Sequence, residues 1–180
     1  MVPPEARALA DFWREAGFER WFSRNDDFDA ELRARFLPAH EAAARGELDG
    51  WLETPDGALA LLLLLDQLPR NLFRGTPRMY ATDAAGLQAA EKAIALGHDR
   101  RVEPALRVFF YLPHMHSEGL ADQERCVALT AGLEERVTSA AREHLEIVAR
   151  FGRFPHRNAI LGRETTPEER RYLDEGGFAG

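Results

Sequence analysis

The sequence is poor in cysteine, lysine and long apolar runs. Its single cysteine, Cys126, cannot form an intramolecular disulfide, which is typical of a protein kept in a reducing cytoplasm. The longest apolar run, residues 58–65, is far shorter than the ~20 residues that a membrane span needs. The N-terminus has no basic start followed by an apolar stretch, so we expect no signal peptide. These absences predict a cytoplasmic protein that does not insert into a membrane.

Positive charge is also scarce. Lysine and arginine together number 23 against 30 aspartate and glutamate residues, which gives a net charge of -7. A protein with this balance has no general electrostatic attraction for nucleic acid or for an anionic membrane. Lys92 is the only lysine, and each of the other residues in the lysine-plus-arginine count is an arginine. We therefore expect neither a nucleic-acid partner nor a membrane partner.

Common catalytic and cofactor motifs are missing as well. The sequence contains no Walker loop, no GxGxxG after a strand, no HExxH, no CxxC and no GxSxG. The usual signatures of nucleotide-binding proteins, zinc proteases and serine hydrolases are thus absent. We expect no cofactor and no metal, and a metal site that uses His116 and Glu118 with His156 or Asp66 is kept only as a weaker alternative.

The sequence does contain repeated helix start and stop signals, formed by proline and glycine, and it shows no strand pattern. This predicts one all-α domain over residues 1–180, a bundle or superhelix of about seven to eight helices with a glycine-rich tail from about residue 176. A helix closed by Gly17 and a second helix kinked or broken at Pro38 are expected. Residues 54–68 should form a central buried helix ended by Pro69, because this stretch is apolar on every side. Thr166 and Glu169 spell a capping box for a last helix.

Three segments place aromatic or apolar residues directly beside charged and amide side chains. We call them the leucine segment (residues 61–75), the histidine segment (residues 111–118) and the arginine segment (residues 150–158). Helix surfaces usually keep these classes on separate faces. Their mixture at chain breaks indicates polar groups held against a core, as in a binding pocket.

Read together, TPDGALALLLLLDQLPRNLFRGTPRMYATD, FFYLPHMHSE and HLEIVARFGRFPHRNAILGRETTPEE resemble the bacterial domain-of-unknown-function family nine-two-four. The resemblance extends over nearly the whole chain, and it implies an all-helical fold similar to tetratricopeptide repeats. It implies no activity. The family's recurrent positions fall on Asp66, Gln67, Pro69, Arg70, Asn71, Arg74 and Gly75, on His116, Ser117 and Glu118, and on His144, Arg153, Pro155, His156, Arg157, Asn158 and Arg163.

The leucine segment has two interpretations. Asp66, Arg70 and Arg74 are spaced four apart and would share one face of a continuous helix. Either Asp66 pairs with Arg70 at the end of a buried helix, or an arginine presents its guanidinium to an anionic ligand while Asp66 orients it. Arginine suits carboxylate or phosphate because its fork binds two oxygens at once.

The histidine segment is also open to more than one interpretation. His114, His116 and Glu118 alternate, so an extended chain would point all three to one side, where a metal could bind. Alternatively, Ser117 caps the next helix and Glu118 adds charge to its first turn. The spacing alone is a weak signal for a metal site. The capping interpretation accounts for Ser117 and Glu118 but does not explain His116.

His144, which precedes the arginine segment, is expected on the buried face of its helix. It is either a hydrogen-bonded core residue or a general acid or base. Arg153, His156, Arg157 and Asn158 follow a helix stop at Gly152 and a rigid turn at Pro155. Ordered loops of this composition are common ligand sites, but the same side chains could cap the carbonyls of neighbouring helix ends.

Two functional hypotheses follow. In the first, the segments form a site for a small phosphate- or carboxylate-bearing molecule, with acid–base catalysis by His116, Glu118 and His156 as an option. Its ligand-binding residues would be Asp66, Gln67, Arg70, Asn71, Arg74, His144, Arg153, Arg157 and Asn158. In the second, the protein is a non-enzymatic helical scaffold for a peptide or protein partner, and the motifs are structural locks.

Overall fold

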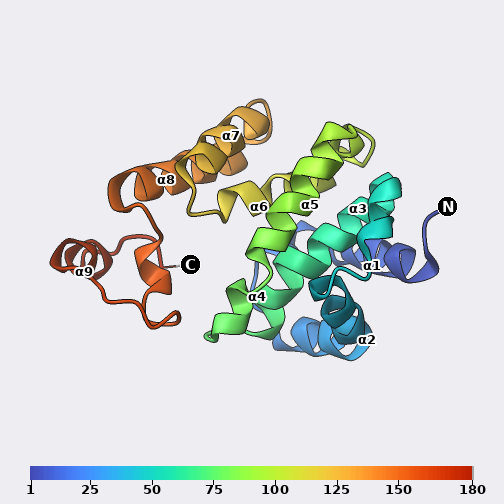
Figure 1. The fold of residues 1–180 in the computed structure, drawn as a ribbon, viewed down its shortest axis with the longest axis horizontal. Helices are drawn as coiled ribbons and strands as arrows, with labels where there is room; N and C mark the ends of the chain where they lie inside the picture. Colours follow the sequence, from blue (N-terminus) through green and yellow to red (C-terminus); the bar gives the residue numbers. More distant parts are fainter. Residues whose placement is uncertain (180) are drawn as a thin grey trace. The chain divides into compact units, whose positions relative to one another are not determined.

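The structure, a computed structural model, describes residues 1–179, and these residues form helices and turns without any strand (Figure 1). The predicted all-α fold is confirmed. No helix in this range combines the length and the apolar character that a membrane crossing requires. The α-helices of the described residues are α1 (Pro4–Trp21), α2 (Asp26–Ala44), α3 (Pro55–Leu62), α4 (Leu68–Leu72), α5 (Asp83–Ala95), α6 (Leu112–Met115), α7 (Leu120–Thr130), α8 (Glu135–Phe151) and α9 (Pro167–Asp174).

The chain divides into two compact units. Unit 1 comprises Met1–Arg74 and Arg78–Pro113, and unit 2 comprises Gly75–Pro77 and the residues from His114 onward. Short 3-10 helices connect the longer elements, at Asp49–Glu53, Pro77–Tyr80, His98–Arg100, Pro104–Phe110 and Pro155–Arg157. The extent of the predicted domain, residues 1–180, stays a prediction.

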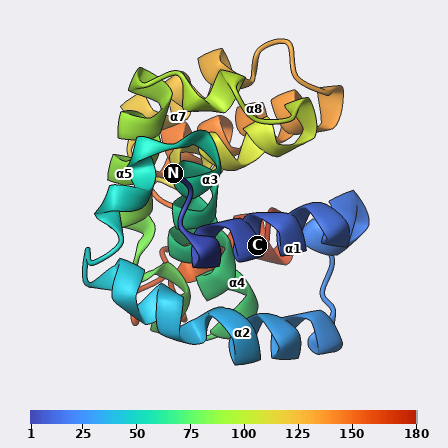
Figure 2. The same ribbon diagram turned by 90° about the vertical axis from the view of Figure 1, so that its right-hand side faces the viewer.

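Helix α3 and its continuation are the centre of unit 1. Helices α1 and α5 pack against α3, while α2 packs against α4 and the turn that precedes it (Figure 2). Residues 57–65 are all buried, as their uniformly apolar composition predicts. Around them, the Trp13 ring contacts Phe28 and Phe109 at centroid distances of 5.7 and 5.6 Å. The apolar run is therefore the core of this unit and not a surface.

The buried helix does not end where the sequence predicted. Thr54 caps its start by accepting the Gly57 N–H at 3.2 Å, but α3 ends at Leu62 and gives way to a π-helical turn, Leu63–Gln67. Helical structure then continues as α4, with Pro69 in its first turn. Pro69 has no N–H for the carbonyl of Leu65, but the Thr82 hydroxyl donates to that carbonyl instead, so the loss is compensated and the helix does not stop here. The expectation that Pro69 ends the helix is wrong for this reason.

The π turn changes the backbone pairing of the leucine segment. The Leu68 N–H donates to the carbonyl of Leu63, five residues back, and Pro69 has no N–H to offer Leu65. Buried carbonyls need hydrogen-bond donors. Side chains supply one to each of three consecutive carbonyls: His40 Nδ1 to Leu64 at 2.8 Å, Thr82 Oγ1 to Leu65 at 2.5 Å and Arg70 Nη1 to Asp66 at 2.8 Å.

Two other helix boundaries also depart from local signals. Gly17 (φ 71°) interrupts the helical backbone of α1, yet helical turns resume after it and reach Trp21. Helix α2 runs without a break from Asp26 to Ala44 although Pro38 lies inside it. Gly17 therefore interrupts α1 without ending it, and Pro38 does not break α2.

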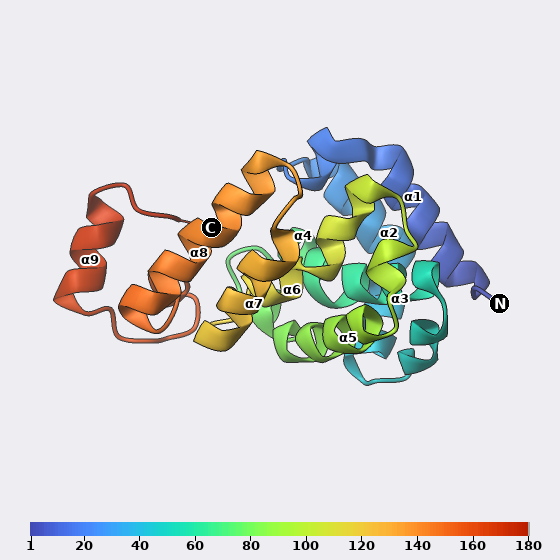
Figure 3. The ribbon, with the colours of Figure 1, turned by 90° about the horizontal axis from the view of Figure 1, so that it is seen from above.

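Unit 2 is built on the pair α7 and α8, which lie side by side (Figure 3). Helix α8 buries Ala141, His144, Ile147 and Val148 on one face, and it ends at Gly152 in the left-handed conformation (φ 68°). The predicted capping box of α9 is confirmed, because Thr166 Oγ1 accepts the Glu169 N–H while Glu169 accepts the Thr166 N–H. Helix α9 packs against the turn Pro155–Arg157.

Candidate functional site

The charged residues of the leucine segment bind one another or other residues of unit 1. Arg70 lies between two carboxylates: its Nη1 is 3.2 Å from Asp66 Oδ1, and its two terminal nitrogens donate to Asp83 at 2.9 and 3.1 Å. Gln67 donates to Asp66 at 2.6 Å. Burial would lower the pKa of Arg70, but the charges of Asp66 and Asp83 raise it above its ordinary value. The guanidinium is therefore held as a buried ion pair.

Asn71 and Arg74 share a single partner on α2. Asn71 Nδ2 donates to Asp29 Oδ1 at 2.7 Å, and Arg74 forms an ion pair with the other oxygen of Asp29. The five predicted ligand-binding residues of this segment therefore lie together in unit 1. The pairing of Asp66 with Arg70 is one of the two interpretations that their spacing left open, but the sequence gave no signal for Asp29 or Asp83 as partners.

In unit 2, Glu118 ties the histidine segment to the arginine segment. Its Oε1 accepts the Phe154 N–H at 2.8 Å, and the Arg163 guanidinium binds both its oxygens at 2.7 and 2.9 Å. Burial would raise the pKa of Glu118, but Arg163 and the Phe154 N–H outweigh it and lower the pKa. Glu118 is thus an ionised carboxylate held by an arginine fork, a poor proton donor at neutral pH.

A second carboxylate, Glu169, orders the arginine segment from the start of α9. It accepts hydrogen bonds from Arg153 at 2.6 and 2.9 Å, from Asn158 at 3.2 Å and from the Thr166 N–H at 2.7 Å. The bond from Arg153 is the main cause that lowers the pKa of Glu169 to about 2. Two predicted ligand-binding residues, Arg153 and Asn158, are therefore engaged by one internal carboxylate that the sequence indicated only as a cap.

His144 and His156 are close together in unit 2, and their rings contact Phe154 at centroid distances of 5.4 and 5.7 Å. His144 Nδ1 lies 2.8 Å from the Ala140 carbonyl. A carbonyl only accepts, so this nitrogen carries the proton and the neutral ring keeps its lone pair on Nε2. Burial, followed by the charges of His116 and Arg157, lowers the pKa of His144 to about 4.

The second ring behaves in the same way. Burial, followed by the charges of Arg157 and His144, lowers the pKa of His156 to about 4. Its Nδ1 is buried and has no hydrogen-bond partner among the residues that the structure describes. Both imidazoles are therefore uncharged at pH 7, and each offers an unprotonated ring nitrogen.

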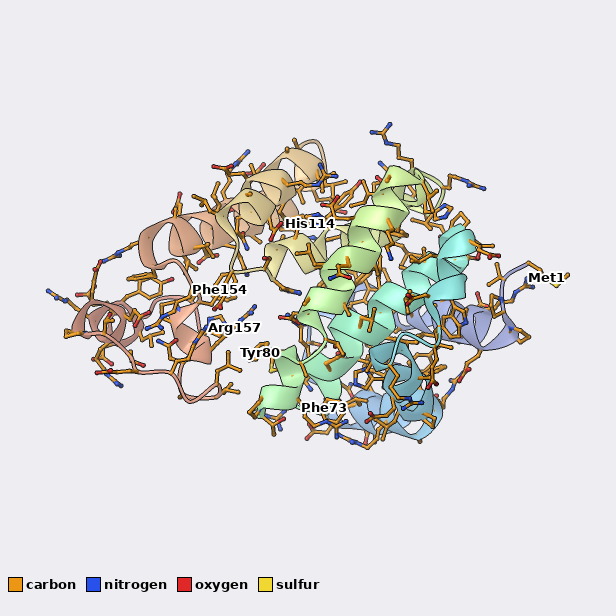
Figure 4. All side chains as sticks on the ribbon, viewed as in Figure 1. Met1, Phe73, Tyr80, His114, Phe154 and Arg157 are labelled. Carbon is orange, nitrogen blue, oxygen red and sulfur yellow. The ribbon has the colours of Figure 1, made fainter. Side chains whose placement is uncertain are left out.

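Arg157 completes this group. It is buried, its Nη2 donates to the His116 carbonyl at 2.9 Å, and its guanidinium carbon lies 4.5 Å from the centroid of the Phe154 ring. Figure 4 labels Phe154 and Arg157 on the chain that follows α8. We refer to His116, His144, His156 and Arg157 as the imidazole–guanidinium cluster. The fold collects it from three separate stretches of the chain, which sequence reasoning could not establish.

The spacing in the histidine segment that suggested a metal site does not correspond to a group of potential metal ligands in the described residues. Over residues 1–179, no three histidine, cysteine, aspartate or glutamate side chains are grouped as a metal site would need. His114 is fully buried, while Glu118 is bound by Arg163. The spacing of these side chains therefore carries no metal proposal.

Comparison with known proteins agrees with the fold. Residues 9–177 match the family described as bacterial protein of unknown function (DUF924). A solved structure of a protein of unknown function from Agrobacterium tumefaciens is 56% identical and has a TM-score of 0.93, with 95% of this chain and 97% of that chain covered. No curated protein matches. The family resemblance is thereby confirmed.

Proposed function

We propose that this chain, which belongs to the bacterial family DUF924, binds a small phosphate- or carboxylate-bearing anion at the imidazole–guanidinium cluster. The observation that carries the proposal is the position of Arg157, a buried guanidinium that donates to the His116 carbonyl and stacks on Phe154, beside the two imidazoles. Arg157 contributes to lowering the pKa of both His144 and His156. Burial alone would disfavour any charge here, but the buried Arg157 guanidinium supplies a positive charge beside both imidazoles, and a positive charge attracts an anion.

Neighbouring guanidiniums do not take part in the proposed site. Arg153 binds Glu169 and Arg163 binds Glu118, each through two nitrogens. These pairs compensate their own charges and hold the backbone on which the cluster is built. The proposed ligand-binding groups are Arg157 and the imidazole nitrogens, because they lie together in the cluster, with Arg153 and Asn158 as supporting residues.

The two neutral imidazoles also suit acid–base chemistry. His144 Nε2 has a lone pair that can accept a proton, and a bound anion would make the charged imidazolium more stable. Anion binding and protonation of the cluster are thus linked. Affinity should rise as the pH falls from neutral towards about 4, the pKa of both rings.

Titration of the histidine side chains by NMR tests the proposal. In saturating inorganic phosphate or acetate, we expect the pKa of His144 and of His156 to rise by about one unit, which is about 1.4 kcal/mol of added interaction with the charged form. The Arg157→Lys variant keeps the charge but not the fork, and it should bind either anion less tightly. Arg142→Lys, an exposed position on α8, is the matched control. Unchanged histidine pKa values in both anions would overturn the proposal.

A second candidate function is the non-enzymatic scaffold. Arg70, Arg74 and Arg153 each bind an internal carboxylate, which favours a structural role for the motifs that contain them. On this proposal, a peptide or protein partner binds elsewhere on the helical surface. It predicts that Arg157→Lys lowers the free energy of unfolding while neither anion changes the melting temperature of the parent protein.

A further inference from the structure

The chain folds back on itself after α9. Gly176 adopts a φ of +86°, the Gly177 N–H donates to the Tyr172 carbonyl at 2.9 Å, and the Phe178 N–H donates to the Tyr172 hydroxyl at 2.9 Å. Glycine adopts the left-handed backbone conformation without strain. This reversal directs Phe178 back towards α8.

The returning ring lies against both imidazoles of the cluster. Phe178 meets His144 at a centroid distance of 4.6 Å and His156 at 5.2 Å, with interplanar angles of 63° and 75°. These are edge-to-face contacts between flat rings. Phe178 is only partly buried, and it also packs against the core cluster of Ile147, Val148 and Phe154, so its ring covers the imidazoles at the edge of this core.

We infer that Phe178 is a lid that occupies the place of a ligand's flat apolar group, so that the site takes an aromatic carboxylate when the tail swings away. The inference rests on the proposed function of the cluster. The volume beside His144 and His156 already accepts a phenyl ring, and Arg157 lies in the same cluster to bind a carboxylate. An aromatic carboxylate combines both groups in one molecule.

The attachment of the lid suits a part that moves. The N–H groups of Gly177 and Phe178 both donate to one residue, Tyr172, and two glycines precede the ring. A lid that is open about one tenth of the time weakens the apparent affinity about tenfold relative to a protein whose site is always open. The lid therefore sets the affinity without contacting the anionic group.

Two variants remove the lid in different ways. Phe178→Ala deletes the ring. Gly177→Ala keeps the ring but displaces the tail, because a Cβ at this position would lie 2.5 Å from the Tyr172 ring and 2.6 Å from its carbonyl oxygen. Leu120→Ala, at an exposed apolar position elsewhere in unit 2, is the control.

The experiment is calorimetric titration of the full chain and these variants with benzoate and with acetate. We expect Phe178→Ala and Gly177→Ala to bind benzoate about tenfold tighter than the parent protein, with a smaller gain for acetate and no change in Leu120→Ala. Equal affinity of the parent protein and both lid variants for benzoate would overturn the lid and leave the anion site standing. No binding of either anion by any variant would remove the anion site, and the lid inference with it.

An NMR titration gives an independent measure of the cover. His116, Arg157, Glu118 and Arg163 contribute charge around the two rings, and the lid variants leave all four in place. Opening the lid reduces burial, so the pKa of His144 and of His156 should rise from about 4 towards 6.5. Unchanged values in both variants would mean that Phe178 does not cover the rings in solution.

Discussion

Replacing Glu169 with glutamine tests the network that holds the arginine segment. The Glu169 side chain is 3% exposed, and it accepts hydrogen bonds from Arg153, Asn158 and the Thr166 N–H. Glutamine has nearly the same shape but only one acceptor oxygen, and its amide group would face the Arg153 guanidinium. Glu169→Gln should therefore destabilise the protein at pH 7 while leaving the helices intact.

The magnitude follows from the pKa of this carboxyl. Pairing lowers the pKa of Glu169 from 4.5 to about 2. A difference of this size corresponds to roughly 3.4 kcal/mol of stability. The partner Arg153 is 28% exposed, so water screens part of the interaction and about 2 kcal/mol remains.

The pH dependence has a defined sign. Because the folded-state pKa is lowered, the stabilisation is fully present above pH 4.5 and is lost as the pH falls towards about 2. The difference between the parent protein and Glu169→Gln should therefore narrow over this interval. The glutamine side chain does not titrate, so the variant should lose less stability in acid.

Urea unfolding followed by circular dichroism measures both effects. The control is Glu168→Gln, a neighbouring glutamate whose ion pair with Arg150 is more than half exposed at both ends, and its effect should be below about 0.5 kcal/mol. If Glu169→Gln and the parent protein unfold at the same urea concentration at pH 7, or if their difference does not narrow in acid, the reasoning about this carboxyl is wrong.

Three further predictions concern other parts of the chain. Trp13→Ala should lower the free energy of unfolding by about 3–5 kcal/mol in urea titrations, because a fully buried indole leaves a cavity; a loss below 1 kcal/mol would contradict its place in the core. Asn25→Ala should cost about 1 kcal/mol through loss of the α2 cap, whereas Asn25→Asp should be nearly neutral, and equal effects would count against capping. Arg163→Lys should raise the pKa of Glu118 towards 4.5 in a carbon-13 NMR titration, since lysine cannot bind both oxygens as a fork; an unchanged pKa would refute this.

Local sequence signals located several helix ends. Gly152 ends α8, and Thr166 with Glu169 forms the capping box of α9, as the sequence indicated. Each of these signals acts within a few residues of the chain, so composition and spacing contain them. The predicted start of α3 at Thr54 and Pro55 is confirmed for the same reason.

Long-range partners explain what the sequence could not predict. The course of the chain through Pro69 depends on His40 and Thr82, which are distant in sequence and carry no local sign of that role. Spacing offered the pair of Asp66 and Arg70 as one of two interpretations, since residues four apart share a helix face. It could not show that Asp83 binds the same guanidinium, because that contact requires the fold.

The same limit applies to the candidate site. His144 was expected on a buried helix face, which is confirmed, and the arginine segment was expected to form an ordered turn. Nothing in the sequence indicated that the glycine-rich tail returns to place Phe178 on His144 and His156. Glycines near a chain end usually suggest only a loss of regular structure. Which aromatic ring comes to cover the two histidines depends on where the chain turns, and the sequence does not show this.

The side-chain donors to the leucine carbonyls have a consequence for the order of folding. A helix that completes its own backbone pairing can form early from local interactions, but the π turn between α3 and α4 also uses donors from α2 and from the residue before α5. Donors so distant in sequence arrive only after long loops have closed, and non-local contacts of this kind slow folding. We expect the leucine-rich stretch to be among the last parts of unit 1 to become protected from hydrogen exchange. Until then it is an exposed apolar segment, and a nascent chain that pauses at this stage is the form most prone to aggregate.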